Sequence, residues 1–183
     1  MSNLRHILRP ELDRIIHFVC NIAGISPKYF KQEIKIRLIS SGKTESYFDE
    51  DRNIAYINFN EAGWEGFNPV FGRFWQYLVF HEIGHYFESF VARDPQFIRL
   101  FGDVDAFYDE KGVHKNLPKR LDERFVSRYA AKHPSEDWAE TFATALIIRY
   151  FNDEKELKAM NQKKYYKKIL YVYKALKTIK EVR

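Results

Sequence analysis

Cysteine is almost absent from this sequence, because Cys20 is the only thiol among its 183 residues. A single thiol excludes an intrachain disulfide and leaves too few thiolates for a cysteine-rich zinc site. The scarcity also fits a reducing compartment. A metal site in this chain must therefore use histidine nitrogens and carboxylate oxygens.

Long apolar runs are absent as well, and no stretch approaches the length of a membrane span. The N-terminal region lacks a clean signal peptide, because apolar residues 15–25 follow acidic residues and are interrupted by His17 and Asn21. We therefore expect no membrane span and a cytoplasmic location, with secretion by another route left open. Internal repeats are missing too, which excludes a repeat architecture.

Apolar and aromatic residues are plentiful: 45% of the chain is hydrophobic and 17% is aromatic. This is enough for a sizeable core in one domain. The net charge of +5 is uneven, because residues 152–183 carry ten Lys or Arg against four Asp or Glu. We expect a domain over residues 1–152 and a basic, amphipathic helical extension over 153–183.

The most informative stretch is H-E-x-x-H at residues 81–85. Two histidines four residues apart on a helix share a face, so His81 and His85 can both reach one zinc ion. Glu82 lies beside that ion, and in H-E-x-x-H sites this glutamate is the general base. The alternative is a chance spacing of ordinary histidines, which we expect in roughly one chain of this size in a few hundred.

The residues around the motif predict a helix. Asn68 and Pro69 are typical of an N-cap and a first helical position, and Pro95 follows the end of the apolar pattern. Gly84 costs about 1 kcal/mol in a helix interior, so we expect another backbone to pack closely against it. Apolar residues recur at helical spacing: Phe71, Phe74, Trp75, Leu78, Val79, Ile83, Tyr86, Phe87, Phe90 and Val91.

The sequence predicts three elements before the motif. An amphipathic helix is expected over residues 10–23, opened by Pro10 and closed by Gly24. Alternating apolar and charged residues predict a strand over 33–40, and residues that favour strands predict a second one over 53–60. The second strand directly precedes the motif helix, so we expect it to form a sheet edge that pairs with an extended peptide.

Turn residues predict three connections, a turn at 41–43 and loops at 61–68 and 102–120. The loop at 61–68 leads into the motif helix. Its Trp64 and Phe67 either line a substrate pocket or close the core, and the sequence favours neither.

Two histidines do not complete a catalytic zinc site, which needs a third protein ligand and an open position. The metzincin pattern requires Gly at 88 and His at 91, whereas this chain has Glu88 and Val91. His114, His133 and downstream carboxylates remain as candidates.

The best candidates are Glu136 and Glu140, which lie one turn apart in a helix predicted over residues 134–150. One carboxylate would ligate zinc while the other hydrogen-bonds the free nitrogen of a ligand histidine. The small side chain of Ala139 lets this helix approach the motif helix. Acids in a first turn also complement the helix dipole, which accounts for Glu136 but not for Glu140.

These stretches together resemble the zinc-binding metallopeptidases of gluzincin type. That family shows H-E-x-G-H followed by a segment like R-Y-A-x-x-H-P-x-E-D-W-A-E, and this chain has HEIGH at 81–85 and RYAAKHPSEDWAE at 128–140. The resemblance covers roughly residues 71–148. It implies an α+β, zincin-like domain in which a small sheet packs on the motif helix and on a second, glutamate-bearing helix.

The chain is also distantly similar to the catalytic domain of anthrax lethal factor, where the first glutamate of an E-x-x-x-E helix ligates zinc. Carried over, this makes His81, His85 and Glu136 the zinc ligands and Glu140 their hydrogen-bonding support. A tyrosine seven residues before the ligand assists catalysis there, and Tyr129 has that position here. The resemblance does not cover the N-terminal sixty residues or the tail, so it implies no substrate preference.

The sequence thus predicts a hydrolase: a zinc metallopeptidase that cleaves a peptide or protein substrate with a zinc-activated water and Glu82 as general base. Zn²⁺ is the expected cofactor, and the oligomeric state is open. One alternative is a non-catalytic zinc protein that binds a partner, although a purely structural site needs no base such as Glu82.

The other alternative is a binder of nucleic acid or of acidic partners through the tail, where residues 163–168 read KKYYKK. Aliphatic residues at helical spacing explain the same segment as a solvated helix face, and we favour that interpretation. We therefore expect no nucleic-acid partner.

Overall fold

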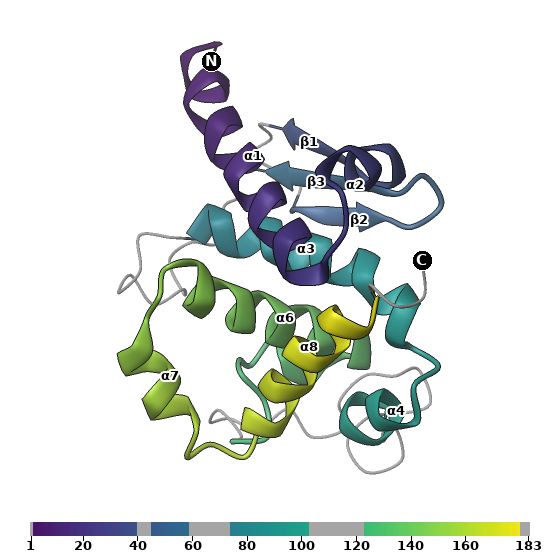
Figure 1. The fold of residues 1–183 in the computed structure, drawn as a ribbon, viewed down its shortest axis with the longest axis vertical. Helices are drawn as coiled ribbons and strands as arrows, with labels where there is room; N and C mark the ends of the chain where they lie inside the picture. The colour runs from purple at the N-terminus through teal and green to yellow at the C-terminus, as the bar shows by residue number, and fades with distance from the viewer. Residues whose placement is uncertain (1, 40–44, 59–73, 103–122, 180–183) are drawn as a thin grey trace.

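The computed structural model describes residues 2–39, 45–58, 74–102 and 123–179. A three-stranded sheet stands at one end of the molecule, and helices make up most of the remaining described chain (Figure 1). The motif helix α3 (Phe74–Val91) runs beneath the sheet, and α6 (Pro134–Tyr150) packs along the other side of α3. The expected α+β class is confirmed, with a small sheet on the motif helix and a second glutamate-bearing helix.

Helix α1 extends over Ser2–Ala23, so the predicted start at Pro10 is wrong. Pro10 lies inside the helix at an exposed position, where the carbonyl that loses its N–H partner can bond to water instead. The predicted end at Gly24 is confirmed. Gly24 has a φ of 64°, and the N–H of Ile25 donates to the carbonyl of Cys20 at 3.0 Å.

The sheet contains β1 (Lys35–Ile39), β2 (Tyr47–Asp49) and β3 (Ile54–Asn58) in the order β1-β3-β2. Strand β1 is parallel to β3, and β2 is antiparallel to it. The strands predicted over 33–40 and 53–60 are confirmed with shorter bounds. The prediction that the second strand forms an edge is wrong. The three-residue β2, too short for alternation to reveal, occupies one side of β3 and makes it the central strand.

Short helices connect the larger elements. Helix α2 (Pro27–Glu33) joins α1 to the sheet, and α4 (Pro95–Phe101) follows α3. The carboxylate of Asp94 caps α4 by accepting the backbone N–H of Gln96 at 2.7 Å. The motif helix therefore ends where the sequence predicted, before the Asp94-Pro95 pair.

Several predicted features lie outside the described residues. These are the helix start at Asn68, the turn at 41–43, the loop at 61–68 with Trp64 and Phe67, and most of the loop at 102–120.

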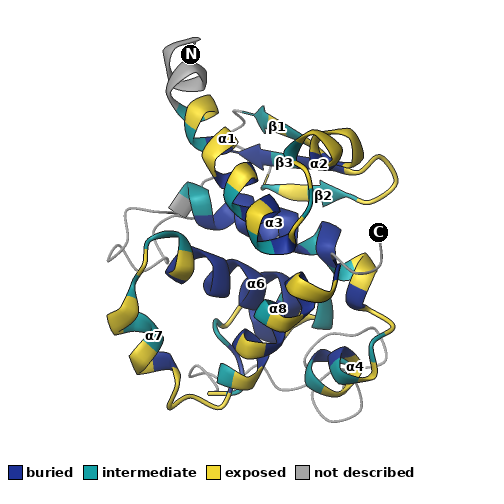
Figure 2. Cartoon of the chain, in the orientation of Figure 1, coloured by how far each residue is buried: buried dark blue, intermediate teal, exposed yellow. Residues whose placement is uncertain are grey.

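Helix α6 has the bounds that the sequence predicted. The 3₁₀ turn η3 (Ala130–Lys132) leads into it, and His133 caps it by accepting the backbone N–H of Ser135 through Nδ1 at 3.1 Å. Its apolar residues are buried as expected, since Trp138 and Phe142 are each at most 1% exposed. The helix therefore lies in the centre of the molecule (Figure 2).

The C-terminal region forms two helices, α7 (Glu154–Met160) and α8 (Tyr166–Ile179). Helix α8 packs against α6 and α1, and its apolar residues belong to the same hydrophobic cluster as those of α3 and α6. Among the described residues, no helix is both long and apolar enough to cross a membrane.

Candidate metal centre

The site is built where α3 and α6 approach each other closely. A Cβ added to Gly84 would lie 3.2 Å from the Cα of Ala139 and 3.3 Å from the Cβ of Phe142. The indole N–H of Trp138 also donates to the Gly84 carbonyl at 2.8 Å. The close backbone approach predicted at Gly84 is thus confirmed, and it places one helix face of each element against the other.

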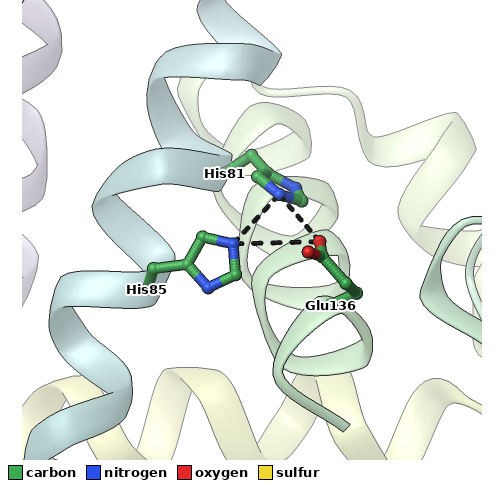
Figure 3. Close-up of side chains that lie close together, drawn as sticks. All are labelled: His81, His85 and Glu136. Atoms are coloured by element: carbon green, nitrogen blue, oxygen red, sulfur yellow. Dashed lines mark hydrogen bonds and ion pairs between the residues drawn. The ribbon is translucent and has the colours of Figure 1, made fainter. Parts of the chain in front are cut away.

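This approach brings His81, His85 and Glu136 together (Figure 3). The Nε2 atoms of the two histidines are 3.2 Å apart. Oε2 of Glu136 lies 3.1 Å from Nε2 of His81 and 3.8 Å from Nε2 of His85. Three donor atoms from two helices therefore converge on one point, and the group could hold a metal ion.

The spacing of these atoms fits zinc. Ligand atoms about 2.05 Å from a tetrahedral zinc ion lie about 3.3 Å from one another, and the three measured separations bracket that value. Two imidazole nitrogens and one carboxylate oxygen are also a common donor set for catalytic zinc, which keeps its fourth position open. Geometry and chemistry agree on the kind of ion that suits this group.

The other nitrogen of His81 is held by Glu140. Nδ1 of His81 lies 2.9 Å from Oε1 of Glu140, and the Ser127 hydroxyl donates to Oε2 of the same carboxylate at 2.5 Å. The oxygen of Ser127 in turn accepts the backbone N–H of Ala130 at 3.0 Å. A carboxylate on the distal nitrogen fixes the tautomer and the orientation of a metal-binding imidazole.

The carboxylates also set the charge of His81. Burial by itself lowers its pKa, but hydrogen bonds with Glu136 and Glu140 and the charge of Glu82 together raise the pKa well above its ordinary value. For Glu136, burial opposes ionisation, and the contact with His81 outweighs it and lowers the pKa. The site therefore favours an ionised carboxylate beside a protonated imidazole, and a metal that takes the imidazole nitrogen must displace a proton.

His85 is held differently, by two residues that the sequence analysis missed. Its Nδ1 lies 3.1 Å from the hydroxyl oxygen of Ser135, and that hydroxyl donates to Oε2 of Glu88 at 2.5 Å. Two signals in the sequence could have found them. Glu88 lies one turn after His85, and Ser135 directly precedes Glu136.

Glu82 and Tyr129 lie at the same site. Glu82 is 3% exposed, and its charge contributes to the raised pKa values of both His81 and Tyr129, so its carboxylate lies near both. The ring of Tyr129 is 6.0 Å from that of His81 between centroids. Burial, followed by the charges of Glu136 and Glu45, raises the pKa of Tyr129, so its hydroxyl keeps its proton.

Of the two other candidate ligand histidines, the one that the structure describes is not part of this group. His133 uses its Nδ1 to cap α6 and is not among the clustered ligand atoms. His114 lies outside the described residues.

Comparison with known proteins gives a family. A family model described as "Putative zinc-binding metallo-peptidase" matches residues 77–180 of this chain. The match covers more than half of the sequence, and it includes both histidines, Glu136 and helix α8.

Similar curated proteins include an uncharacterised protein of Mycobacterium bovis and uncharacterised proteins of two strains of Mycobacterium tuberculosis. Each is 44% identical to this chain over 77 residues. That stretch is 38% of this chain and 23% of each relative, so the chain spans less than a quarter of the length of these relatives. No solved structure matches the chain with significance.

Proposed function

This chain belongs to the family of zinc-binding metallo-peptidases, and we therefore propose that it hydrolyses peptide bonds with a zinc ion held by His81, His85 and Glu136. The observation that carries the proposal is the convergence of these three donor atoms at 3.1–3.8 Å beside a buried Glu82. A structural zinc site has four protein ligands and no general base. The three ligands that the described residues supply, with a neighbouring carboxylate, indicate an open, catalytic site instead.

Each protein group has a distinct task in this proposal. Zinc, when bound, supplies the positive charge that lowers the pKa of water and polarises the scissile carbonyl. Glu82 takes the proton from the attacking water and passes it to the leaving amine. Tyr129 keeps its proton at neutral pH and can donate it in a hydrogen bond to the developing oxyanion, where one good donor contributes roughly 3 kcal/mol.

The substrate we propose is an extended peptide that pairs with β2. Strand β2 is an edge strand next to the motif helix, because it contacts α3 and has β3 on one side only among the described residues. The charge of Glu45, two residues before β2, contributes to the raised pKa of Tyr129, which supports a position of this edge within electrostatic reach of Tyr129. Edge strands bind extended peptides through main-chain hydrogen bonds. The sequence analysis expected the strand over 53–60 to pair with an extended peptide, and we now propose β2 for this role instead.

The proposal is tested by measuring metal content and hydrolysis of a mixed peptide library on wild type and on Glu82→Gln. We expect one zinc per chain in both proteins. We expect cleavage only in the wild type, because glutamine keeps the shape of the side chain but cannot accept the proton. The loss should be at least about 100-fold, the usual contribution of a general base.

The other outcomes are equally decisive. Zinc lost on Glu82→Gln would make Glu82 a ligand rather than the base. Zinc in both proteins without cleavage in either would favour the non-catalytic alternative, and a wild-type protein without zinc would refute the metal site itself.

A further inference from the structure

The two histidines of the proposed site differ in what holds their second nitrogen. For His81 the partner of Nδ1 is a carboxylate in direct contact, Glu140 at 2.9 Å. For His85 the partner is the hydroxyl of Ser135 at 3.1 Å, and the nearest carboxylate oxygen, on Glu88, is 3.8 Å from Nδ1. A hydroxyl thus stands between this imidazole and its carboxylate.

When Nε2 of His85 faces a metal, the two hydrogen bonds that link His85, Ser135 and Glu88 have only one possible donor–acceptor direction. Nδ1 then carries the proton and must donate it. Ser135 accepts that hydrogen bond and has one proton of its own, which it donates to Glu88 at 2.5 Å. Every donor in the chain is used once, and the Glu88 oxygen that accepts at its end fixes the direction of both hydrogen bonds.

We propose that Ser135 and Glu88 are positioning residues that act in series: Glu88 orients the Ser135 hydroxyl, and the hydroxyl fixes the ring of His85 for the metal. This inference rests on the proposed zinc site and adds residues that the sequence motif does not contain. The contacts are partly shielded from water, since the side chains of His85 and Glu88 are 13% and 23% exposed. Water therefore competes less for the hydroxyl than it would at a fully exposed position.

The position of Ser135 gives the hydrogen bond a second task. Ser135 lies in the first turn of α6, directly before Glu136, and its backbone N–H is already bound to the cap residue His133. The contact with His85 and Glu88 thus ties the turn that carries one proposed ligand to the helix that carries the other two. Loss of the hydroxyl should therefore leave the His85 ring less well oriented and the distance between α3 and α6 at the ligands less well fixed.

The test is the dissociation constant for zinc, measured by competition with a chromophoric chelator. We expect Ser135→Ala to weaken zinc binding by about 10- to 100-fold, the usual effect of removing a hydrogen-bonding partner of a metal ligand. Ser135→Thr, which restores a hydroxyl, should recover most of the affinity. Ser89→Ala is the matched control. It removes an α3 hydroxyl that donates to the backbone carbonyl of Tyr86 rather than to a side chain of the site.

The serial arrangement makes a sharper prediction for the double variant. Because Glu88 acts through Ser135, Glu88→Ala should weaken zinc binding in wild type but add nothing to Ser135→Ala. Independent, additive effects of the two substitutions would refute the series. A zinc affinity of Ser135→Ala within twofold of wild type would refute the positioning role as a whole.

Unfolding of the metal-free proteins separates positioning from general stability. We expect the urea midpoint of metal-free Ser135→Ala to fall only slightly below that of wild type, because the two hydrogen bonds that it loses are partly exposed. A much larger loss would make the residue structural and overturn the proposal. A failure of the zinc site is distinguishable as well, because wild type itself would then bind no zinc.

Discussion

Two glutamates on one face of α6 meet the two different nitrogens of the same imidazole. Glu136 approaches Nε2 of His81 at 3.1 Å, and Glu140 approaches Nδ1 at 2.9 Å. An imidazole presents one nitrogen to a metal and uses the other for a hydrogen bond. In the proposed zinc site the two carboxylates therefore have different tasks, although they are chemically identical and one turn apart.

This difference predicts unequal effects on metal affinity. We expect Glu140→Ala to weaken zinc binding by about 10- to 100-fold, as for other hydrogen-bonding partners of metal ligands. Glu136→Ala should weaken binding further, because it removes a proposed ligand and leaves two. Competition titrations with a zinc chelator measure both values, and the reverse ranking would exchange the roles of the two residues.

At the scale of elements, α8 supplies a buried cation to α6. The ammonium group of Lys168 pairs with the carboxylate of Asp137, and these side chains are 11% and 1% exposed. The ammonium also lies over the rings of Phe101 and Phe125, 5.3 Å and 4.7 Å from their centroids. Asp137 follows Glu136 directly, so a helix near the end of the chain supports the turn that carries the proposed ligand.

Removing this cation should be costly for stability. We expect Lys168→Met to lower the free energy of unfolding by about 3–5 kcal/mol, because it leaves Asp137 buried without its counter-ion. Lys167→Met is the control: Lys167 is the exposed neighbour on the same helix, and its substitution should have little effect. Urea unfolding measures both variants. Equal stabilities would show that Lys168 is as dispensable as a surface lysine.

The elements that the sequence predicted share a strong local signal. Helices α3 and α6 have long apolar repeats with proline or capping residues at their ends, β1 begins with alternating charged and apolar residues, and β3 contains residues that favour strands. Strand β2 was missed because three residues carry no period. Because β2 was missed, β3 was wrongly predicted to be an edge strand. Strand order depends on pairing between residues that are distant in the sequence.

The site, like the fold, was predictable only where the sequence carries a local signal. The motif and the paired glutamates are local spacings, so His81, His85, Glu136 and Glu140 could be proposed from the sequence. Ser135, Glu88 and the Lys168–Asp137 pair depend on contacts between helices. From the sequence alone, Lys168 within KKYYKK is predicted to be a solvated charge. The structure shows it packed against α6, with only 9% of the whole residue exposed. Only the remaining exposed lysines fit the predicted solvated face.

For the whole molecule, a metal at this site would join the two central helices. Zinc that binds only the folded chain adds stability, by about 2.7 kcal/mol when its concentration is 100 times the dissociation constant. In a chain of this size, each kcal/mol raises the melting temperature by roughly 2–4 °C. We therefore expect a chelator to lower the melting temperature by about 5–10 °C under those conditions.

The His85→Ala variant provides the control for this measurement. Its melting temperature should not respond to chelator, because the third donor atom is missing. A wild-type melting temperature that is equally indifferent would contradict the proposed metal centre, whatever the hydrolysis assay shows.

The ion pair between α8 and α6 has a consequence for the order of events during synthesis. Asp137 and Lys168 are 31 residues apart, and a ribosome that adds 5–20 residues per second needs roughly 2–6 s for that interval. All three proposed zinc ligands are therefore made before the lysine that neutralises the acid beside the last of them. A nascent chain passes through a stage with all three proposed metal ligands and an unmatched charge beside the last of them, which should delay completion of the proposed zinc site until α8 has emerged.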